Sequence, residues 1–522
     1  MENDALTITI TASEYESLKA IEAEKSELEA LVKYYEEQLR LSKHRQFGAS
    51  SEKTVCPEQM NIFNEVENTA DPGVAEPTLE EVTYKRRKRV GKREDDLSGL
   101  PVEVVEHTLS EYEQVCPDCG GALHTMAHDV RRELEIIPAQ VKIVEHKRAV
   151  YSCRDCEKSG DHSPIVKAPM LEPVIPGSLA SPSAVAHIMV QKYEMCVPLY
   201  RQEKSWEREG VYLSRQTMAN WVIKTAFDWL VLIYIRLKSC LLTHDILHAD
   251  ETTVQVLHES GRKAQDKSYM WLYRTSGETK TPVVLYEYKE TRHHEHPKAF
   301  LRDFKGYLLT DGLRQYHLLD VTSVGCWAHV RRKFDDALKV MEENQRPGSR
   351  AQKGQDCCNR FFALERDWAG LSPEERFDRR TRESKPLAEA FFEWAASAAA
   401  WDRVLPKSAL GKALTYACDQ RPYLMNVYLD GRLEISNNRA ERSIKPFVMG
   451  RKNWLFCNSP NGATASSIVY SIIETAKENG LKPFEYLKFL FETVPNTTTG
   501  QLESVLPWGD AVPERCRMPV NS

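Results

Sequence analysis

The alternation of apolar and polar positions first predicts a long helix near the start of the chain. Residues 13–45 contain no Gly or Pro, and their apolar residues recur at heptad spacing: Leu18, Val32 and Leu39 at one position, and Ile21, Leu28 and Tyr35 three residues later. This spacing predicts a coiled-coil dimerisation helix over residues 1–48, although Lys25 occupies one position of the seam. A long amphipathic helix that packs on its own chain is the alternative.

Helical periodicity returns over residues 175–240, where turn residues divide it. Ser181 and Pro182 start one helix, Pro198 precedes a second, and Ser214 can cap a third that begins at Arg215. This arrangement fits a helix-turn-helix whose recognition helix carries Arg215 and Trp221. Ordinary packing of helices explains the same pattern.

The pattern changes to α/β over residues 241–340. Five strands are expected, at His244–Val256, Tyr269–Arg274, Pro282–Tyr288, Tyr307–Thr310 and Val321–Cys326, with helices at Pro297–Phe304 and Trp327–Val340. Residues 341–430 are charged and helical, which indicates an insertion within this domain. Residues 431–463 return to the core, and residues 464–522 form a mostly helical C-terminal segment. The fold class is therefore α/β with a helical insertion.

Composition and charge narrow the class of protein. The chain has 522 residues, of which 42% are apolar and 28% charged, and these are ordinary values for globular domains. The net charge of −6 gives no global positive field, so any contact with a polyanion must come from local basic patches. Arg236 interrupts the longest apolar run, Trp229–Ile235, and the N-terminus is acidic. We therefore expect a cytoplasmic protein with no membrane segment.

A basic run marks residues 49–107, which have the composition of a linker. Seven of the nine residues from Lys85 to Arg93 are positively charged, beginning with Lys85, Arg86, Arg87, Lys88 and Arg89. Such a run cannot be buried, and phosphate of nucleic acid is a suitable partner. A solvated flexible segment is the alternative.

Two CxxC pairs predict a metal site in residues 108–170. Cys116 and Cys119 form the first pair, and Cys153 and Cys156 form the second, with 33 residues and a predicted strand at 141–151 between the pairs. Four thiolates arranged in this way complete a tetrahedral site for structural Zn²⁺, which leaves no open position for chemistry. Four free buried cysteines are the alternative.

Three carboxylates stand where the predicted core would present them to a site. Asp250 lies within an apolar strand, Asp311 ends another strand before Gly312, and Glu441 lies among basic residues after the insertion. Because side chains alternate along a strand, only one of Asp250 and Glu251 should join a given site, and we choose Asp250.

Each choice has an alternative. Asp311 can be an ordinary turn residue, and Glu441 can form a capping box with Asn438. Three carboxylates from separate elements suit two Mg²⁺ ions that activate an in-line displacement at phosphorus. Basic residues around them would hold the DNA backbone, namely Arg331, Arg332, Lys333, Arg442, Lys445, Arg451 and Lys452.

With these residues the chain resembles the insertion sequence 66 family of bacterial DDE-type transposases. The resemblance rests on the CPxCG…CxxC segment, HADET at 248–252, TDG at 310–312, CWAHVRRKF at 326–334, NNRAERSIKP from 437, GRKNWLF to 456 and IIETAKENGLKPFEYL at 472–487. It implies a ribonuclease-H-like core with Asp250, Asp311 and Glu441 as catalytic acids, and it identifies Cys326 and His329 with a Cys-x-x-His element. Ser436 departs from the Asp that family members usually carry.

The resemblance also implies an activity and its partners. The expected reaction is cleavage at the element ends followed by attack of the freed 3′-hydroxyl on target DNA, with Mg²⁺ or Mn²⁺ as catalytic ion and Zn²⁺ as structural ion. The expected partners are double-stranded DNA, further copies of the chain and small accessory transposition proteins. A ribonuclease-H-like nuclease or resolvase that cuts without joining, and a non-enzymatic zinc-containing DNA-binding regulator, are the competing hypotheses.

Overall fold

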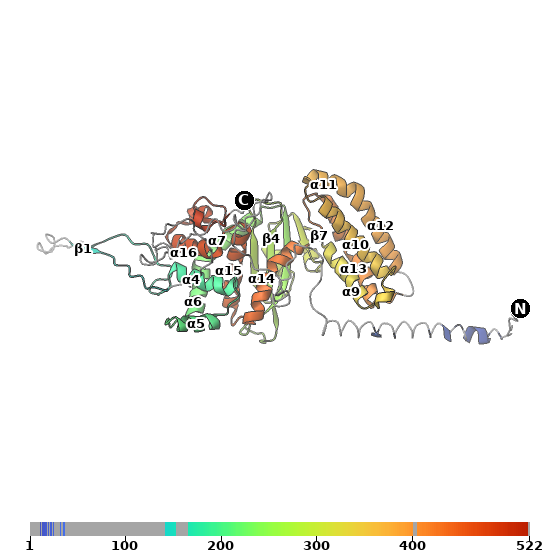
Figure 1. Ribbon diagram of the computed structural model, residues 1–522, viewed down its shortest axis with the longest axis horizontal. Coiled ribbons are helices and arrows are strands. Elements are labelled where there is room, and N and C mark those ends of the chain that lie inside the picture. The colour runs from blue at the N-terminus through green and yellow to red at the C-terminus, as the bar shows by residue number, and fades with distance from the viewer. Residues whose placement is uncertain are drawn as a thin grey trace, which may run out of the picture. The chain divides into compact units, whose positions relative to one another are not determined.

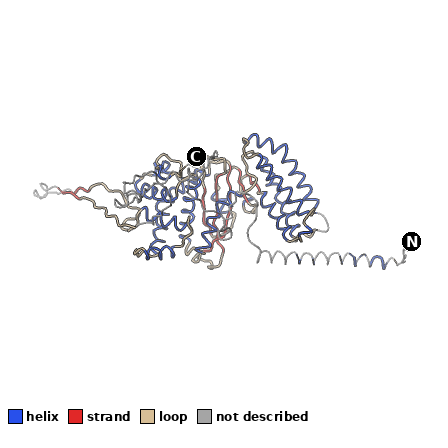
Figure 2. Tube along the Cα trace, in the orientation of Figure 1, coloured by secondary structure: helices blue, strands red, loops and turns tan. Residues whose placement is uncertain are grey.

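The computed structural model describes residues 141–152, 165–399 and 404–519, together with scattered residues between 11 and 36. The chain divides into two compact units: residues 1–49 with 171–518, and residues 50–170 with 519–522. Figure 1 shows the elements with their labels, and Figure 2 distinguishes helices from strands. The four predicted zinc ligands and the basic run Lys85–Arg93 lie outside the described residues.

A five-stranded sheet is the centre of the larger unit. Its strand order is β5-β4-β3-β6-β7. The bounds are Ile246–Gln255 for β3, Lys267–Thr275 for β4, Val284–Lys289 for β5, Tyr307–Thr310 for β6 and Thr322–Gly325 for β7. Strands β3, β4 and β5 are antiparallel, whereas β6 and β7 run parallel to β3. The five strands predicted between residues 241 and 340 are therefore confirmed, with boundaries shifted by only a few residues.

Helix α15, Pro460–Glu478, covers the edge of the sheet at β5. The Val284 amide donates to Thr475 Oγ1 at 3.0 Å, and the Tyr286 amide donates to Ser471 Oγ at 2.8 Å. These hydroxyls satisfy backbone groups that would otherwise offer an open edge to another chain. The C-terminal helices α15 and α16, Pro483–Thr493, thus belong to the core of this unit.

Helices occupy the other edge of the sheet, beyond β7 (Figure 1). Helix α9, Trp327–Lys339, packs against α10, Arg350–Asp367, and α13, Ala409–Leu424. Helices α11, Pro373–Arg379, and α12, Lys385–Ala399, complete this part of the chain, with Trp327 fully buried among Phe361, Phe391 and Phe392. The predicted helical character of residues 341–430 is confirmed.

Helices α4, Pro182–Tyr193, α5, Leu199–Arg208, and α6, Arg215–Thr225, follow the predicted order. Ser181 and Ser214 each accept a hydrogen bond from a backbone amide of the first turn, as expected of N-caps. Trp221 is buried, so this residue packs in the core and is not presented to a ligand. A further short helix of this unit, α8, spans Glu295–Phe300.

Helix α6 continues through the π-helical turn η2, Ala226–Leu230, into α7, Val231–Leu241. Within the described part of the chain, Arg215–Leu241 is the single helix whose length and composition would allow it to cross a membrane. We had expected none, because Arg236 ends the apolar run. The side chains of Ile233, Leu237 and Leu241 are fully buried in the protein core, whereas Phe227 and Ile235 are 37% and 54% exposed, and 39% of the most apolar stretch of this helix is buried.

Of two segments outside the sheet region, one is less regular than predicted and the other is helical, as predicted. The predicted strand at 141–151 forms only at its end, where β1, Val150–Ser152, pairs antiparallel with β2, Ile165–Lys167. Near the N-terminus, the described residues from 13 to 36 are helical. Ile21, Val32 and Tyr35 of the heptad seam are 59%, 57% and 63% exposed. The coiled coil and its alternative, packing on the same chain, both stay predictions.

Candidate active site

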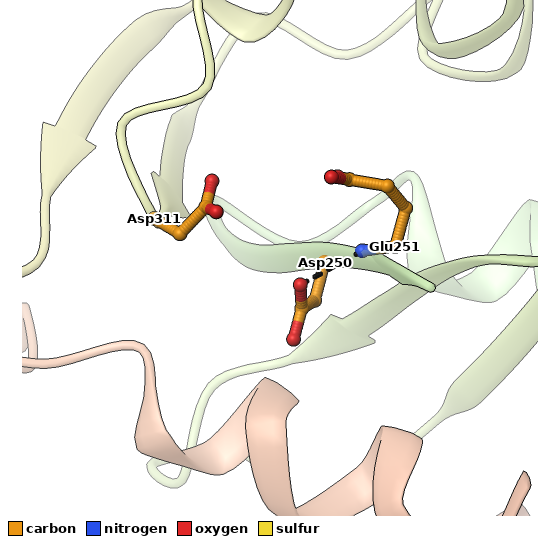
Figure 3. A group of neighbouring side chains, drawn as sticks. All are labelled: Asp250, Glu251 and Asp311. Atoms are coloured by element: carbon orange, nitrogen blue, oxygen red, sulfur yellow. Dashed lines mark hydrogen bonds between the residues drawn. The ribbon is translucent and has the colours of Figure 1, made fainter. Parts of the chain in front are cut away.

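Strands β3 and β6 are parallel neighbours, and they bring two of the three predicted carboxylates together. Asp250 lies in β3, and Asp311 directly follows β6. One oxygen from each of Asp250, Glu251 and Asp311 lies within 4.8 Å of the other two (Figure 3). The expectation that only Asp250 or Glu251 could approach the site is therefore wrong, because Glu251 is long enough to reach back toward Asp311.

Figure 3 shows how the two neighbours in β3 differ. The Asp250 carboxylate points to the side of the strand where the pale orange ribbon of α14, Asn438–Trp454, lies, whereas Glu251 extends to the other side. Glu251 already has strong partners, because Arg292 Nε donates to it at 2.9 Å and the Tyr316 hydroxyl at 2.7 Å. Asp250 accepts a hydrogen bond only from the Glu251 amide among the described groups, at 2.8 Å. Asp250 is thus the better placed of the two to bind a cation.

The turn after β6 fixes Asp311. One of its carboxylate oxygens accepts the Leu313 amide at 3.1 Å, and its backbone carbonyl accepts the Tyr416 hydroxyl of α13 at 2.8 Å. Gly312 has φ +88°, and a Cβ there would lie 2.8 Å from both the Tyr416 hydroxyl and Gln420 Oε1. Glycine is therefore required by backbone conformation and by the close approach of α13. Asp311 is a turn residue as well as a member of the carboxylate group.

Glu441 comes from α14, Asn438–Trp454. The capping-box alternative for this residue is wrong, because Asn437 is the N-cap and α14 has no side-chain cap hydrogen bond. Glu441 Oε2 lies 3.3 Å from the Arg332 guanidinium, and Oε1 lies 3.7 Å from His329 Nε2. Among the described groups, Oε1 is buried and accepts no hydrogen bond. Glu441 therefore faces the start of α9 and keeps one acceptor for another partner.

A buried amide holds the start of α14 against β3. Asn437 is fully buried, and its Nδ2 donates to the Ala249 carbonyl at 2.8 Å. Its Oδ1 lies 3.0 Å from His248 Nδ1, so His248 Nδ1 must carry the proton of this hydrogen bond. The backbone N–H of Asn437 donates to Cys326 Sγ at 3.1 Å. Asn437 thus joins the strand of Asp250, the helix of Glu441 and the helix of His329.

The carboxylates act on one another electrostatically. Burial, then the charges of Glu251, Asp311 and Glu441, raises the pKa of Asp250 well above its usual value. Burial also raises the pKa of Glu251, and Asp311 adds to this, although Arg292 opposes the shift. These like charges favour a bound proton or a bound cation between them.

His329 lies in the first turn of α9, next to Glu441. Its Nε2 accepts a hydrogen bond from Arg332 at 3.0 Å. Burial, followed by the charge of Arg332, lowers the pKa of His329, whereas Glu441 and Asp311 oppose the shift. The imidazole is therefore neutral, with its proton on Nδ1. Sequence patterns had left the roles of Cys326 and His329 open, and packing assigns both to the surroundings of Glu441.

The predicted DNA-binding residues differ in their surroundings. Arg451 is half-buried and its guanidinium donates to the Thr253 carbonyl of β3, so it ties the two elements together. Arg331 donates to Asn359 at 2.6 Å, and Lys333 lies over the Tyr416 ring. Three of the others are exposed, namely Arg215, Arg442 and Lys452, and Lys445 is partly exposed. Sequence reasoning missed Asn437, although the Asn-Asn pair before Glu441 was a usable signal.

The donor set fits a hard divalent cation. It consists of carboxylate oxygens of Asp250, Glu251 and Asp311, and burial together with the neighbouring negative charges raises the pKa of Asp250. Glu441 Oε1 is buried nearby and accepts no hydrogen bond among the described groups. Glu434, the carboxylate nearest in sequence on the same segment, is instead bound to Arg439 at 2.6 Å. Among the described residues, the carboxylate oxygens that lie close enough together to share a cation are those of Asp250, Glu251 and Asp311, whereas Glu441 acts on Asp250 through its charge.

Comparisons with known proteins match four segments, which together cover most of the chain, to models of related description. A family model described as "Transposase IS66 family" matches residues 177–465, and "IS66 C-terminal element" matches 471–508. "Zinc-finger binding domain of transposase IS66" matches 113–157, which contains all four predicted zinc ligands. "Transposase C of IS166 homeodomain" matches 34–105, which contains the basic run.

Curated relatives come from Sinorhizobium fredii. The uncharacterized protein y4qI is 28% identical over 96% of this chain and 93% of its own length. The uncharacterized protein y4jD is 29% identical over 76% of this chain and 78% of its own length. These relatives extend the similarity over nearly the whole chain, and their names add no activity.

Proposed function

Because the chain belongs to the IS66 family of transposases, we propose that it cuts the ends of an insertion element and joins the freed 3′-hydroxyls to target DNA. The observation that carries this proposal is the meeting of Asp250 and Asp311 where β6 ends beside β3, with Glu441 of α14 close enough for its charge to act on Asp250. The mixed strand order around β3 supports a ribonuclease-H-like core.

In the proposed reaction, Asp250, Asp311 and Glu441 hold two divalent cations beside the scissile phosphate. When bound, the cations would activate the attacking water or 3′-hydroxyl and stabilise the leaving oxygen. Arg332 lies beside Glu441 and is suited to contact the phosphate once the carboxylate binds a cation. Asn437 holds the start of α14 so that Glu441 faces β3.

The other parts of the chain would bind and organise DNA. We propose that Cys116, Cys119, Cys153 and Cys156 hold structural Zn²⁺ within the segment that matches the zinc-finger description. The basic run from Lys85 would contact DNA phosphate within the segment that matches the homeodomain description. The N-terminal helix would bring copies of the chain together, and the reaction would take place on cytoplasmic DNA.

The decisive experiment is a strand-transfer assay with pre-cleaved element ends and Mg²⁺. Asp250→Asn, Asp311→Asn and Glu441→Gln should each abolish cleavage and joining, while DNA binding survives. Glu287→Gln is the matched control, because Glu287 is a buried carboxylate on β5 of the same sheet that pairs with Lys289.

The outcomes separate the competing hypotheses. Cleavage without joining of pre-cleaved ends would identify a nuclease or resolvase. DNA binding with no metal-dependent chemistry in the unaltered protein would identify a regulator. Loss of activity in Glu251→Gln with full activity in Asp250→Asn would move the first catalytic position to Glu251.

A further inference from the structure

The chain leaves α14 through a strained turn that exposes two apolar side chains. Leu455 has φ +65° and ψ −52°, and the Phe456 amide donates to the Trp454 carbonyl at 2.8 Å. These values define a γ-turn of the strained hand, a backbone conformation that an L-residue such as leucine rarely adopts. Leu455 is nevertheless 62% exposed and Phe456 43% exposed. Local packing of these two side chains therefore does not explain the strain.

Backbone hydrogen bonds connect the strained turn to the end of β3, the strand that carries Asp250. The Cys457 amide donates to the Gln255 carbonyl at 2.9 Å, and the Leu257 amide donates to the Cys457 carbonyl at 3.0 Å. The Arg451 guanidinium adds its contact with the Thr253 carbonyl. The exposed pair thus has a fixed position relative to the carboxylates.

One face of α14 leads from Glu441 to this turn. Lys445 and Lys452 follow Glu441 at four and eleven residues, spacings that place all three on one face of a helix. They lie about 6 Å and 16 Å along the axis, and Leu455 lies about 21 Å along it. Glu441 is the one acidic residue in the sequence of α14. A cationic face therefore joins the carboxylate to the exposed apolar pair.

We propose that Leu455 and Phe456 receive an unstacked nucleobase of the DNA held at the active site. The proposal rests on the proposed function, because DNA is the polyanion that would follow the cationic face. At about 3.4 Å per nucleotide, 21 Å corresponds to a base about six nucleotides from the scissile phosphate. Apolar side chains inserted between base steps and aromatic rings stacked on bases are established ways to hold such a base. The rigid turn keeps the pair exposed before DNA arrives.

The test is fluorescence of 2-aminopurine, an adenine analogue that brightens when it unstacks, in duplexes of the terminal repeat beside the gene. The label is moved one nucleotide at a time from the 3′-hydroxyl, and EDTA prevents chemistry. The unaltered protein should brighten the label most about six nucleotides from the end, as the helix length requires. Phe456→Ala should remove the maximum and weaken binding about tenfold, the size expected for one stacked base.

Three further variants separate this role from folding and charge. Leu455→Gly relieves the positive φ, so it should raise the Tm and still weaken DNA binding. Phe456→Ala should leave the slope of affinity against salt unchanged, whereas Lys445→Ala should lower it by about 0.9. Leu429→Ala is the matched control, since Leu429 is 52% exposed and lies in the helical insertion.

The result that overturns the proposal is an unaltered protein that binds the duplex but shows no maximum, or a maximum that Phe456→Ala leaves in place. Neither result would be evidence against the proposed function, because strand transfer is measured in a separate assay with Mg²⁺. Loss of strand transfer with an intact fluorescence maximum would instead count against the proposed function alone.

Discussion

Replacing Asn437 by alanine should uncouple DNA cleavage from folding. The change removes two side-chain hydrogen bonds, one to the Ala249 carbonyl at 2.8 Å and one with His248 Nδ1 at 3.0 Å. Both partners are buried in β3, where water cannot replace the lost amide. The Asn437 backbone amide still donates to Cys326, so α14 should begin at the same residue but with a looser contact to the strand.

The expected loss of stability follows from the Ala249 carbonyl and His248 Nδ1, which both lose their hydrogen-bond partner. A buried polar group left without a partner costs about 1–3 kcal/mol, so the pair costs roughly 2–6 kcal/mol. Domains of this kind have about 5–15 kcal/mol in total, and the variant should therefore fold at reduced temperature. The effect on chemistry should be larger, because a displacement of about 1 Å at a catalytic group can lower the rate about a hundredfold.

The assay compares Mg²⁺-dependent cleavage per folded molecule with thermal unfolding, at a temperature where circular dichroism shows each variant folded. Asn479→Ala is the matched control. Asn479 Nδ2 donates to the Pro282 and Thr475 carbonyls, each at 2.8 Å, at the end of α15 and away from the carboxylates. The control should lose stability and keep its cleavage rate.

Full cleavage by folded Asn437→Ala, together with the expected loss of stability, would refute the reasoning. It would mean that Asn437 only stabilises the core and that other contacts orient Glu441. A loss of cleavage in both variants would show that the assay reports unfolding.

Four further predictions concern other parts of the molecule. Without metal, Asp250→Asn should raise the Tm at neutral pH. The folded-state pKa of Asp250 is raised, so its ionisation destabilises the fold increasingly as pH rises above the unfolded pKa of about 3.9. Scanning fluorimetry should show that the difference in Tm between the variant and the unaltered protein shrinks toward acid pH, and a difference independent of pH would contradict this cause. Elemental analysis should find about one zinc per chain and none in Cys116→Ser, since a structural site needs all its thiolates. Replacing Leu28 and Val32 by Glu should shift the protein toward monomer in analytical ultracentrifugation, and an unchanged mass would favour intramolecular packing. Neutralising several charges within Lys85–Arg93 should flatten the salt dependence of DNA affinity by about 0.9 per lost phosphate contact, whereas an unaltered slope would mean a solvated linker.

Local patterns in the sequence predicted the elements of the larger unit well. The N-caps at Ser181 and Ser214 and the strand Tyr307–Thr310 follow from short-range chemistry, because a cap or an apolar run needs only its immediate neighbours. The carboxylates at Asp250 and Asp311 were visible for the same reason, since an acidic residue at the end of an apolar strand needs a partner. Glu441 was chosen from the basic residues around it, and the family resemblance, which rests on motifs spread along the chain, matched that choice.

Only the tertiary structure decided how these carboxylates are held. Asn437 joins residues 188 and 189 positions away in the chain, and Arg332 meets Glu441 across 109 positions. Spacing along one sequence carries no information on such contacts, because they depend on how β3, α9 and α14 pack. The same limit explains the error at the site, because Glu251 comes within reach of Asp311 where β6 lies beside β3. It also explains why the capping-box alternative for Glu441 stayed open until the structure showed that Asn437 is the N-cap of α14 and that this helix has no side-chain cap hydrogen bond.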